Sequence, residues 1–525
     1  MKINNKIIIL AMLVMMIACV SAVSATDIES SDNVTDVIEV DEVTDVVEED
    51  VIDDVSEDVV EEDVDGVCDD SDECDCCIVG ANSVIVNDTN YVNYFDSTTG
   101  WTTSNNNLTF VGSFTPKTFG NFKIGSSVIV NACNATFTNV GFDLKVSHIT
   151  LCGGTFIGDA TTNLTSVISA EADHAIIKCV TMNLTAPENK DCYAINLANA
   201  EKSKILNNEI YYTDLYKNQL NYNYVIKVID SANVLIDGNK INANVPIKRV
   251  NYTRSGINAD MVAAVAVYNC NYLNFTNNNL TTEITNISDE YPTLSEVLIL
   301  DSGNVKVAGN KIVMKDEKTG KDETNDLYGI DVYRCNSITI DNNTININSE
   351  GGQIIINGTG AAYGIQLTGP HNGVVISNNI INTANNGPNL GIYSQNYFGA
   401  TDIVIFGNTI NVTGSAGGHP YALVSGMELQ DTNATVYNNT IRVNNTSPYT
   451  VGNYAFGISY CQATDDSHYF NIHDNNVELI NGDMAVSLRT GSSGFVTFNK
   501  LKTHYGTGDN VVSAPRTEVI VLGNT

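Results

Sequence analysis

Basic residues, tryptophan and cysteine are scarce in this chain of 525 residues. It has 26 Lys and Arg against 61 Asp and Glu, which gives a formal charge of −35. A chain of this charge repels phosphate backbones, so nucleic acid is not an expected partner. With one Trp and 12 Cys, the chain has too few cysteines for a disulfide-dense fold of this length. Beyond residue 78 no segment carries a sustained helical stripe of apolar residues, so long helices are not expected there.

The N-terminus is typical of an export signal. Lys2 and Lys6 precede an uncharged apolar run over residues 7–20, which is followed by small residues, and cleavage is expected after Ala25. Residues 1–25 would then be a signal peptide, and the mature protein would be secreted or held at the cell surface.

Two other interpretations of this segment stay open. The uncharged stretch 7–26 is about long enough to span a bilayer, so without cleavage it would serve as a membrane anchor. Cys19 ends a faint lipoprotein-like box, Met-Ile-Ala-Cys, in which a lipidated cysteine would become the new N-terminus.

Residues 26–77 form a separate acidic module. Between residues 27 and 77 lie 24 Asp and Glu and no Lys or Arg. Val or Ile cycles with Asp or Glu, and the self-repulsion opposes compaction, which predicts a disordered, extended spacer rather than a helix. Without these acids and the two signal lysines, residues 78–525 keep 37 acids and 24 bases, a net charge of −13.

Apart from Cys19, the cysteines fall into two groups. A cluster ends the acidic segment, and because its spacing matches no familiar metal site, disulfide pinning of the following cap is the favoured interpretation. This cluster consists of Cys68, Cys74, Cys76 and Cys77. The others stand alone, and isolated cysteines most often pack as small buried hydrophobes. They are Cys133, Cys152, Cys179, Cys192, Cys270, Cys335 and Cys461.

The main body carries a repeat. An apolar-alternating strand, a turn with Asn, any residue and another aliphatic recur as "VLIDGNKI", "VKVAGNKI", "ITIDNNTI" and "IVIFGNTI". Successive turn asparagines are 24 to 39 residues apart, and degenerate copies place Gly154 and Val180 in the same slot. The aligned residues are Asn208, Asn239, Asn278, Asn310, Asn343, Asn379, Asn408, Asn439, Asn475, Asn499 and Asn524.

A second strand signature precedes the first by 12 to 17 residues, as in "YAINL", "YGIDV", "YGIQL" and "FGISY". Each repeat thus offers two or three strands, which bury their apolar face only by stacking on neighbouring repeats. Intervals as short as 24 residues leave no room for the four strands of a propeller blade. The predicted fold is all-β: a right-handed parallel β-helix of roughly a dozen coils, with a cap and first strands over 78–147 and repeats over 148–525.

The turn asparagines have a structural role in this fold. Asn tolerates left-handed backbone geometry, and stacked side-chain amides can hydrogen-bond along the axis. We therefore interpret them as a ladder of corner residues rather than a ligand site.

With these motifs, residues 80–525 resemble the adhesin-like proteins of methanogenic archaea. The resemblance rests on "VIVNDTNYVNYFDSTTGW" (84–101), "NLTFVGSF" and the coils with "YGI" and "GNTI". It implies an exported β-helix protein that contacts other cells or polysaccharide at the cell surface. Many such proteins end in a membrane-spanning or wall-binding segment, which residues 521–525 do not resemble, so the mode of attachment stays open.

Polysaccharide lyases and hydrolases also use this fold, so an enzyme is the alternative hypothesis. The polygalacturonase-type strings are missing, and Asp331 with Arg334 is the nearest candidate for lyase chemistry. Asp331 and Glu428 are predicted to stack three coils apart, about 14 Å, which is too far for a hydrolytic pair. No catalytic residue is therefore assigned. A groove with carboxylates within reach across neighbouring coils would favour the enzyme, and a smooth Asn, Ser and Thr face would favour adhesion.

Two segments gather residues that bind ligands in other proteins. "CQATDDSHYFNIHDNN" contains Asp465, Asp466, His468 and His473, but its spacing matches no standard metal motif, so neither a metal nor a cofactor is expected. "YYTDLYKNQLNYNY" gathers tyrosines that could stack on sugars or pack against the solenoid, and packing is the favoured interpretation. These are Tyr211, Tyr212, Tyr216, Tyr222 and Tyr224.

Glycosylation sequons are abundant, and export would expose some of them to modification. They include Asn87, Asn107, Asn134, Asn163, Asn183, Asn251, Asn274, Asn286, Asn357, Asn411 and Asn433. The expected function is that of a non-catalytic surface adhesin or structural surface protein, and a carbohydrate-active lyase or hydrolase is the alternative. The sequence predicts no oligomeric state.

Overall fold

A computed structural model describes residues 83–525 apart from short gaps. The gaps are 127, 188–190, 215–223, 246–260, 286–292, 317–325, 350–360, 396–401, 416–422, 448–453, 462–467, 483, 489–492, 505–511 and 514–517. Every described residue lies in one compact unit, residues 66–525. The cluster Cys68 to Cys77 and the segments assigned to signal and spacer lie outside the described residues.

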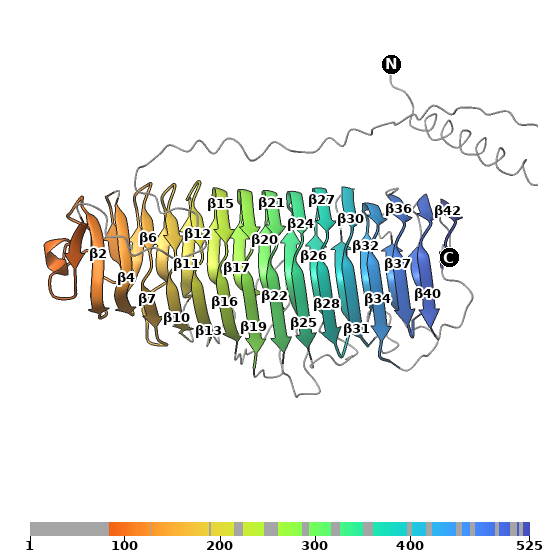
Figure 1. The fold of residues 1–525 in the computed structure, drawn as a ribbon, viewed down its shortest axis with the longest axis horizontal. Coiled ribbons are helices and arrows are strands. Elements are labelled where there is room, and N and C mark those ends of the chain that lie inside the picture. The colour runs from red at the N-terminus through yellow and green to blue at the C-terminus, as the bar shows by residue number, and fades with distance from the viewer. Residues whose placement is uncertain are drawn as a thin grey trace, which may run out of the picture. The chain divides into compact units, whose positions relative to one another are not determined.

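The described chain winds through parallel strands that stack coil upon coil (Figure 1). A complete coil has three strands: one in a 14-stranded sheet and two in a 28-stranded sheet, which we call the first arm and the second arm. Each strand pairs in parallel with its counterparts in the preceding and following coils, as in β21–β24–β27. The predicted fold class, an all-β parallel β-helix, is confirmed.

The 14-stranded sheet consists of β3 (Phe122–Ile124), β5 (Phe142–Leu144), β8 (Ser166–Ala170), β11 (Tyr193–Ala198), β14 (Tyr224–Ile229), β17 (Met261–Tyr268), β20 (Thr293–Leu300), β23 (Asp326–Tyr333), β26 (Ala362–Thr368), β29 (Asn389–Gln395), β32 (Val424–Gln430), β35 (Ala455–Cys461), β38 (Met484–Leu488) and β41 (Val512–Ser513). The first arm consists of β6 (Thr150–Cys152), β9 (Ile176–Lys178), β12 (Lys204–Leu206), β15 (Ala232–Asp237), β18 (Asn271–Thr276), β21 (Gly303–Ala308), β24 (Asn336–Asp341), β27 (Asn372–Ser377), β30 (Asp402–Phe406), β33 (Asn433–Tyr437), β36 (Tyr469–His473), β39 (Ser493–Thr497) and β42 (Glu518–Leu522). The second arm consists of β7 (Thr155–Gly158), β10 (Thr181–Ala186), β13 (Glu209–Asp214), β16 (Lys240–Val245), β19 (Asn279–Ile284), β22 (Lys311–Asp316), β25 (Thr344–Ser349), β28 (Ile380–Asn385), β31 (Thr409–Gly414), β34 (Thr440–Asn445), β37 (Asn476–Ile480) and β40 (Lys500–His504). Before these coils lie β1 (Ser83–Val86), η1 (Tyr91–Asn93), β2 (Asn107–Phe114) and β4 (Ile129–Thr138).

Alternation along each strand fills the interior with aliphatic columns. In β24, Ile338 and Ile340 are buried while Thr339 between them faces outward. Ile340 pairs with Ile376 of the next coil, and Ile376 pairs with Ile405 of the one after. Phenylalanines take over this role in the first coils, where the rings of β2, β3, β4 and β5 pack at the axis. Burial of such columns is the main stabilising term of the fold.

The small residue of the second strand signature is required by close packing. Gly329, Gly364, Gly391, Gly426 and Gly457 stack in consecutive coils of the 14-stranded sheet. A Cβ on Gly391 would lie 2.4 Å from Ile410 Cγ2 and 2.5 Å from the carbonyl oxygen of Gly426. Backbone oxygen cannot move aside, so these positions exclude larger side chains.

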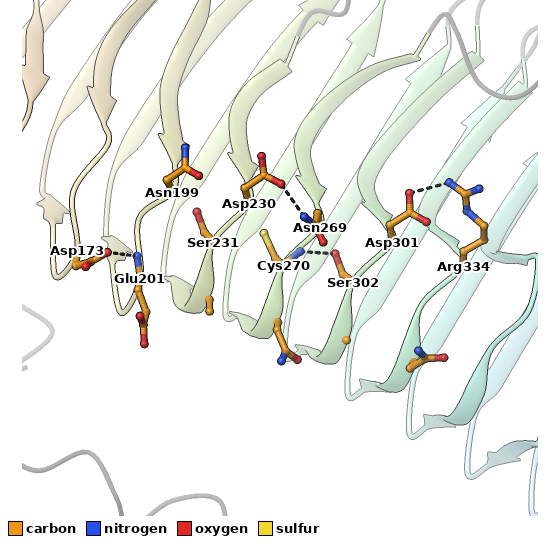
Figure 2. Close-up of a pocket in the computed structure, with 14 residues that line it drawn as sticks. Asp173, Asn199, Glu201, Asp230, Ser231, Asn269, Cys270, Asp301, Ser302 and Arg334 are labelled. Carbon is orange, nitrogen blue, oxygen red and sulfur yellow. Dashed lines mark hydrogen bonds and ion pairs between the residues drawn. The ribbon is translucent and has the colours of Figure 1, made fainter.

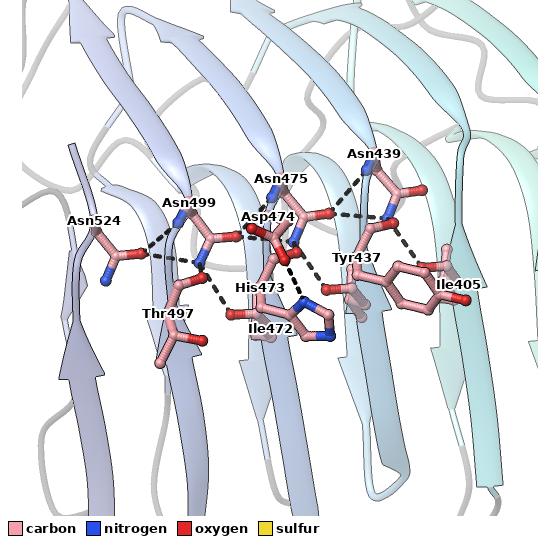
Figure 3. Close-up of polar contacts among 11 residues, drawn as sticks. Ile405, Tyr437, Asn439, Ile472, His473, Asp474, Asn475, Thr497, Asn499 and Asn524 are labelled. Carbon is pink, nitrogen blue, oxygen red and sulfur yellow. Dashed lines mark hydrogen bonds and ion pairs between the residues drawn. The ribbon is translucent and has the colours of Figure 1, made fainter. Parts of the chain in front are cut away.

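The turn asparagines form a continuous ladder between the two arms (Figure 3). Asn475 donates from its backbone N and its Nδ2 to Asn499 Oδ1, at 2.9 Å in both cases. Its Nδ2 also donates to the carbonyl oxygen of Val436 at 2.9 Å. The same bonds join every neighbouring pair from Asn208 to Asn524, and Val180 N donates to Asn208 Oδ1.

One detail of the predicted corner is wrong. The left-handed residue is not the ladder asparagine but the residue before it, as at Gly309 (φ 68°), Asn342 (φ 53°) and Asn378 (φ 55°). The two tasks are divided because the ladder amide must point inward to bond its neighbours, while the preceding residue reverses the chain.

Candidate functional site

A shallow groove of about 590 Å³ follows the corner between the 14-stranded sheet and the first arm (Figure 2). We call it the corner groove. It begins beside Asp173 and ends at Arg334 and Asn336, so it crosses six consecutive coils.

The first wall of the corner groove, the turn wall, is built by residues in the left-handed conformation, with φ between 49° and 50°. One such residue follows each of the strands β11, β14, β17, β20 and β23, where the chain must reverse direction. Such positions favour Asn and Asp over other non-glycine residues, and Arg is an exception here. The turn wall consists of Asn199, Asp230, Asn269, Asp301 and Arg334, whose side chains are exposed.

The second wall, the strand wall, is formed two residues later at the start of the first arm. Its members are Glu201, Ala232, Asn271, Gly303 and Asn336, and the last four are aligned by strand register. Ala232 and Gly303 carry almost no side chain. They alternate with Glu201, Asn271 and Asn336, so the wall is recessed at every second coil.

The floor consists of small buried polar side chains between the two walls, Ser231, Cys270 and Ser302. Cys270 N donates to Ser302 Oγ at 3.1 Å, and Ser302 N donates to Cys335 Sγ at 3.3 Å. Burial raises the pKa of the Cys270 thiol to about 11. The thiol is therefore protonated at neutral pH and serves as a structural group rather than a nucleophile.

Polar contacts order the rim of the groove. Asn269 Nδ2 donates to Asp230 Oδ1 at 2.7 Å, and the Arg334 guanidinium lies 2.7 Å from Asp301 Oδ2 (Figure 2). Arg334 also lies over the Tyr333 ring, 4.7 Å from its centroid. The hydrogen bond to Asp301 raises the pKa of Arg334. Among the described residues, Arg334 is the one cation that lines the groove, and it is thus already paired with a carboxylate.

An aromatic patch lies beside the turn wall on the outer face of the 14-stranded sheet. Tyr193, Tyr224, Leu298 and Leu300 are buried there together with Ala263 and Ala266, and Tyr268 and Tyr333 are half-buried against them. Tyr268 and Tyr333 directly precede groove residues Asn269 and Arg334 in the chain. The corner groove is therefore flanked by aromatic rings on one side.

The catalytic candidates do not come together. Strand register runs from Asp331 through Gln366 and Tyr393 to Glu428, so the two acids lie three coils apart, as predicted. Both are buried, at 3% and 0% exposure. Burial raises the pKa of Asp331 to about 7, against a hydrogen bond from Ser295 that lowers it.

Asp331 and Arg334, the nearest candidates for lyase chemistry, do not contact each other. Arg334 follows the end of β23 and pairs with Asp301 of the preceding coil, whereas Asp331 is buried within the strand and contacts Ser295. The two side chains therefore have different neighbours, although only two residues separate them in the chain.

The candidate metal ligands are dispersed as well. His468 directly precedes β36, whereas His473 ends it. His468 is buried with its Nε2 3.8 Å from Asp431, and His473 Nδ1 lies 2.8 Å from Asp474. Asp465 and Asp466 lie outside the described residues. Within the described part of the chain, no group of three or more His, Cys, Asp or Glu side chains could hold a metal ion.

Three tyrosines of the tyrosine segment lie in strands. Tyr211 and Tyr212 lie in β13 and Tyr224 begins β14, while Tyr216 and Tyr222 lie outside the described residues. Tyr212 and Tyr224 are buried at 2% and 1% exposure, so they pack rather than face a ligand. Tyr211 is exposed, and its hydroxyl donates to Glu209 at 2.6 Å.

The lone cysteines are not all simple core residues. Cys192, Cys270 and Cys335 are buried, as expected, but Cys152 and Cys179 are each disulfide-bonded, which corrects the expectation for those two.

Sequon positions differ in accessibility. Exposed members are Asn134, Asn163, Asn183, Asn274 and Asn411, and intermediate ones are Asn87, Asn107 and Asn433. Asn251, Asn286 and Asn357 lie outside the described residues.

Sequence reasoning missed the corner groove, although its signal is visible. After the second strand signature, a turn residue, a buried Ser or Cys, any residue and then Asn or Ser recur as "DSAN", "DSGN" and "RCNS". The structure also reveals Glu296, which is buried inside the solenoid and level with the glycine column. Burial raises the pKa of Glu296 to about 8.

No protein-family model and no curated protein matches the chain. Solved structures match at the level of fold. A PL6 alginate lyase with a bound trisaccharide is 12% identical, with a TM-score of 0.37 over 84% of this chain and 96% of that chain. The periplasmic alginate epimerase AlgG is 10% identical, with a TM-score of 0.35 over 84% and 83%.

PfbA, a surface adhesin of Streptococcus pneumoniae, is 12% identical, with a TM-score of 0.34 over 64% of this chain and 84% of that chain. These likenesses concern chain fold alone, and they include enzymes and an adhesin. Among the residues described here, no helix has the length and apolar character needed to cross a membrane.

Proposed function

We propose that this protein is an exported surface protein that binds polysaccharide along the corner groove without cleaving it. The observation that carries the proposal is the repetition of amide and carboxylate side chains along both walls, which extend over five of the six coils that the groove crosses. Stacked coils are about 4.8 Å apart, so equivalent side chains recur at a regular short spacing. An extended polymer with repeating hydroxyl groups can meet such a row at several points at once.

The chemistry of the walls supports this ligand class. Amides and carboxylates are directional partners for hydroxyl groups, and the half-buried rings of Tyr268 and Tyr333 lie alongside. Each contact in a shallow, wet groove is weak. Many contacts along one polymer, and many copies of the protein on a surface, add up to avidity.

The cellular setting of the proposal comes from the sequence. A signal peptide ending at Ala25, an acidic spacer over 26–77 and the resemblance to adhesin-like proteins of methanogenic archaea all support export to a surface. Glycosylation of exposed sequons would be consistent with that location.

An enzyme on the same groove is the second candidate, and a specific observation favours it. Asp230 and Asp301 occupy the same wall two coils apart, about 10 Å by coil spacing, close to the wider limit for an inverting hydrolase. Two observations disfavour the enzyme: Asp301 is held by Arg334, and Asp331, whose pKa is raised by burial, does not line the groove. Binding is therefore the better supported function.

The location of the site is tested by blocking the groove. Ala232→Trp fills the recess in the strand wall, whereas Thr281→Trp places the same ring on the outer face of the second arm. We expect Ala232→Trp to abolish sedimentation of the full chain with insoluble polysaccharides and Thr281→Trp to leave it unchanged. Equal binding by both variants would place the site elsewhere.

A further inference from the structure

The corner groove has an uneven charge. In the described part of the chain, four carboxylates line it, Asp173, Glu201, Asp230 and Asp301, and Arg334 is the single lining cation. The formal charge of the lining is therefore −3. Asp230 and Asp301 stand exposed on the turn wall, and Glu201 is exposed on the strand wall, so their charges face a bound polymer directly.

We infer that the groove accepts polysaccharides without acidic groups and rejects polyuronates and sulfated glycans; this inference rests on the proposed function. A polyuronate carries one carboxylate on every sugar, so a chain laid along six coils would bring several of them against the groove acids. Each close like-charge pair is unfavourable, and the repulsion extends over about 10 Å at 0.1 M salt.

Among the groove residues that the structure describes, no unpaired basic side chain is available to neutralise a ligand carboxylate. Arg334 already holds Asp301 at 2.7 Å, so a ligand carboxylate would have to displace that contact. The amide members Asn199, Asn269, Asn271 and Asn336 interact equally well with uncharged hydroxyl or acetamido groups. The same charge disfavours β-elimination of uronates in this groove, because that chemistry requires neutralisation of the substrate carboxylate.

The test compares oligosaccharides of equal length on a glycan array: neutral and N-acetylated hexamers against hexameric galacturonate and alginate, in 20 mM and 1 M salt. The full chain is expected to bind at least one neutral hexamer at least tenfold more tightly than any uronate at low salt. The ratio of neutral to uronate affinity should fall at 1 M salt, because the screening length there is about 3 Å.

The decisive variant neutralises the charge of the groove lining. Glu201→Gln with Asp230→Asn and Asp301→Asn brings the lining to zero while keeping the side-chain shapes. This triple variant should gain uronate binding by tenfold or more.

The matched control removes the same charge from the second arm, through Glu209→Gln, Glu283→Gln and Glu478→Gln, each exposed or half-buried and paired with Lys. This control variant should show no gain in uronate binding. If the unaltered chain binds uronate hexamers as tightly as neutral hexamers at 20 mM salt, this inference is overturned and the proposed function still stands. An array on which no glycan binds would overturn both.

Discussion

Replacing Asn343 by valine tests the ladder that defines the fold. The side chain is 1% exposed and takes part in four hydrogen bonds. Its Oδ1 accepts from Asn310 N at 3.0 Å and from Asn310 Nδ2 at 2.9 Å, and its Nδ2 donates to Val307 O at 2.8 Å and to Asn379 Oδ1 at 3.0 Å. Valine is of similar size and removes all four.

The groups left behind determine the magnitude. Asn310 Nδ2 keeps its bonds to Phe275 and Ala308, and Asn379 Oδ1 still accepts from the backbone N of residue 343. The backbone N–H of Asn310 loses its acceptor in the interior, which costs about 1–3 kcal/mol, and the lost amide bonds add about 1 kcal/mol. We expect the free energy of unfolding to fall by about 2–4 kcal/mol.

Urea unfolding followed by circular dichroism measures this change. Two control variants are measured in the same way. Thr339→Ser on the outer face should change stability by less than about 0.5 kcal/mol. Asn342→Gly should be similarly mild, because φ is 53° there and glycine already occupies the equivalent corner at Gly309 and Gly407. A loss at Asn342→Gly as large as at Asn343→Val would refute the division of tasks between the two corner residues.

Two further predictions concern the interior. Gly391→Ala should destabilise the fold by at least about 1–3 kcal/mol, because the new Cβ would clash with the next coil. Gly303→Ala is the control: its close contact is the movable end of the Asn271 side chain, so its free energy of unfolding in the same melts should stay close to that of the unaltered chain. Buried Glu296 has its pKa raised to about 8 from 4.5, and Asp331 to about 7 from 3.8, so the unfolded chain releases these protons first as pH rises. Stability should therefore decline from about pH 4 to pH 8, by about 4 kcal/mol for Glu296 alone, and Glu296→Gln should flatten that decline; an unchanged pH profile in this variant would disprove the assignment.

The fold was predictable because its signals repeat. Alternation such as Ile338-Thr339-Ile340 identifies a strand, and a recurring asparagine such as Asn343 marks a corner in every coil. Parallel register then aligns equivalent positions, so the separation of Asp331 and Glu428 followed from counting coils. Local pattern and global arrangement agree in a solenoid because each repeat contacts mainly its neighbours.

The site was harder to predict, for a physical reason. The corner groove combines turn residues and strand residues from six coils, and no single repeat contains a complete motif. Burial of Asp331 and Glu428 also could not be anticipated, because alternation indicates that both face outward. Glu296 lies at a position where other coils have glycine, so only the packed interior reveals that its carboxyl group is enclosed.

The most direct test of the account follows binding and turnover in one sample. The full chain is incubated with a polysaccharide that it sediments with, and reducing ends and unsaturated uronate absorbance are measured over a day alongside the bound fraction. The account predicts saturable binding, lost in Ala232→Trp, with no rise in either product signal. Product that accumulates with the unaltered chain and disappears in Asp230→Asn or Asp301→Asn would contradict it and establish an enzyme.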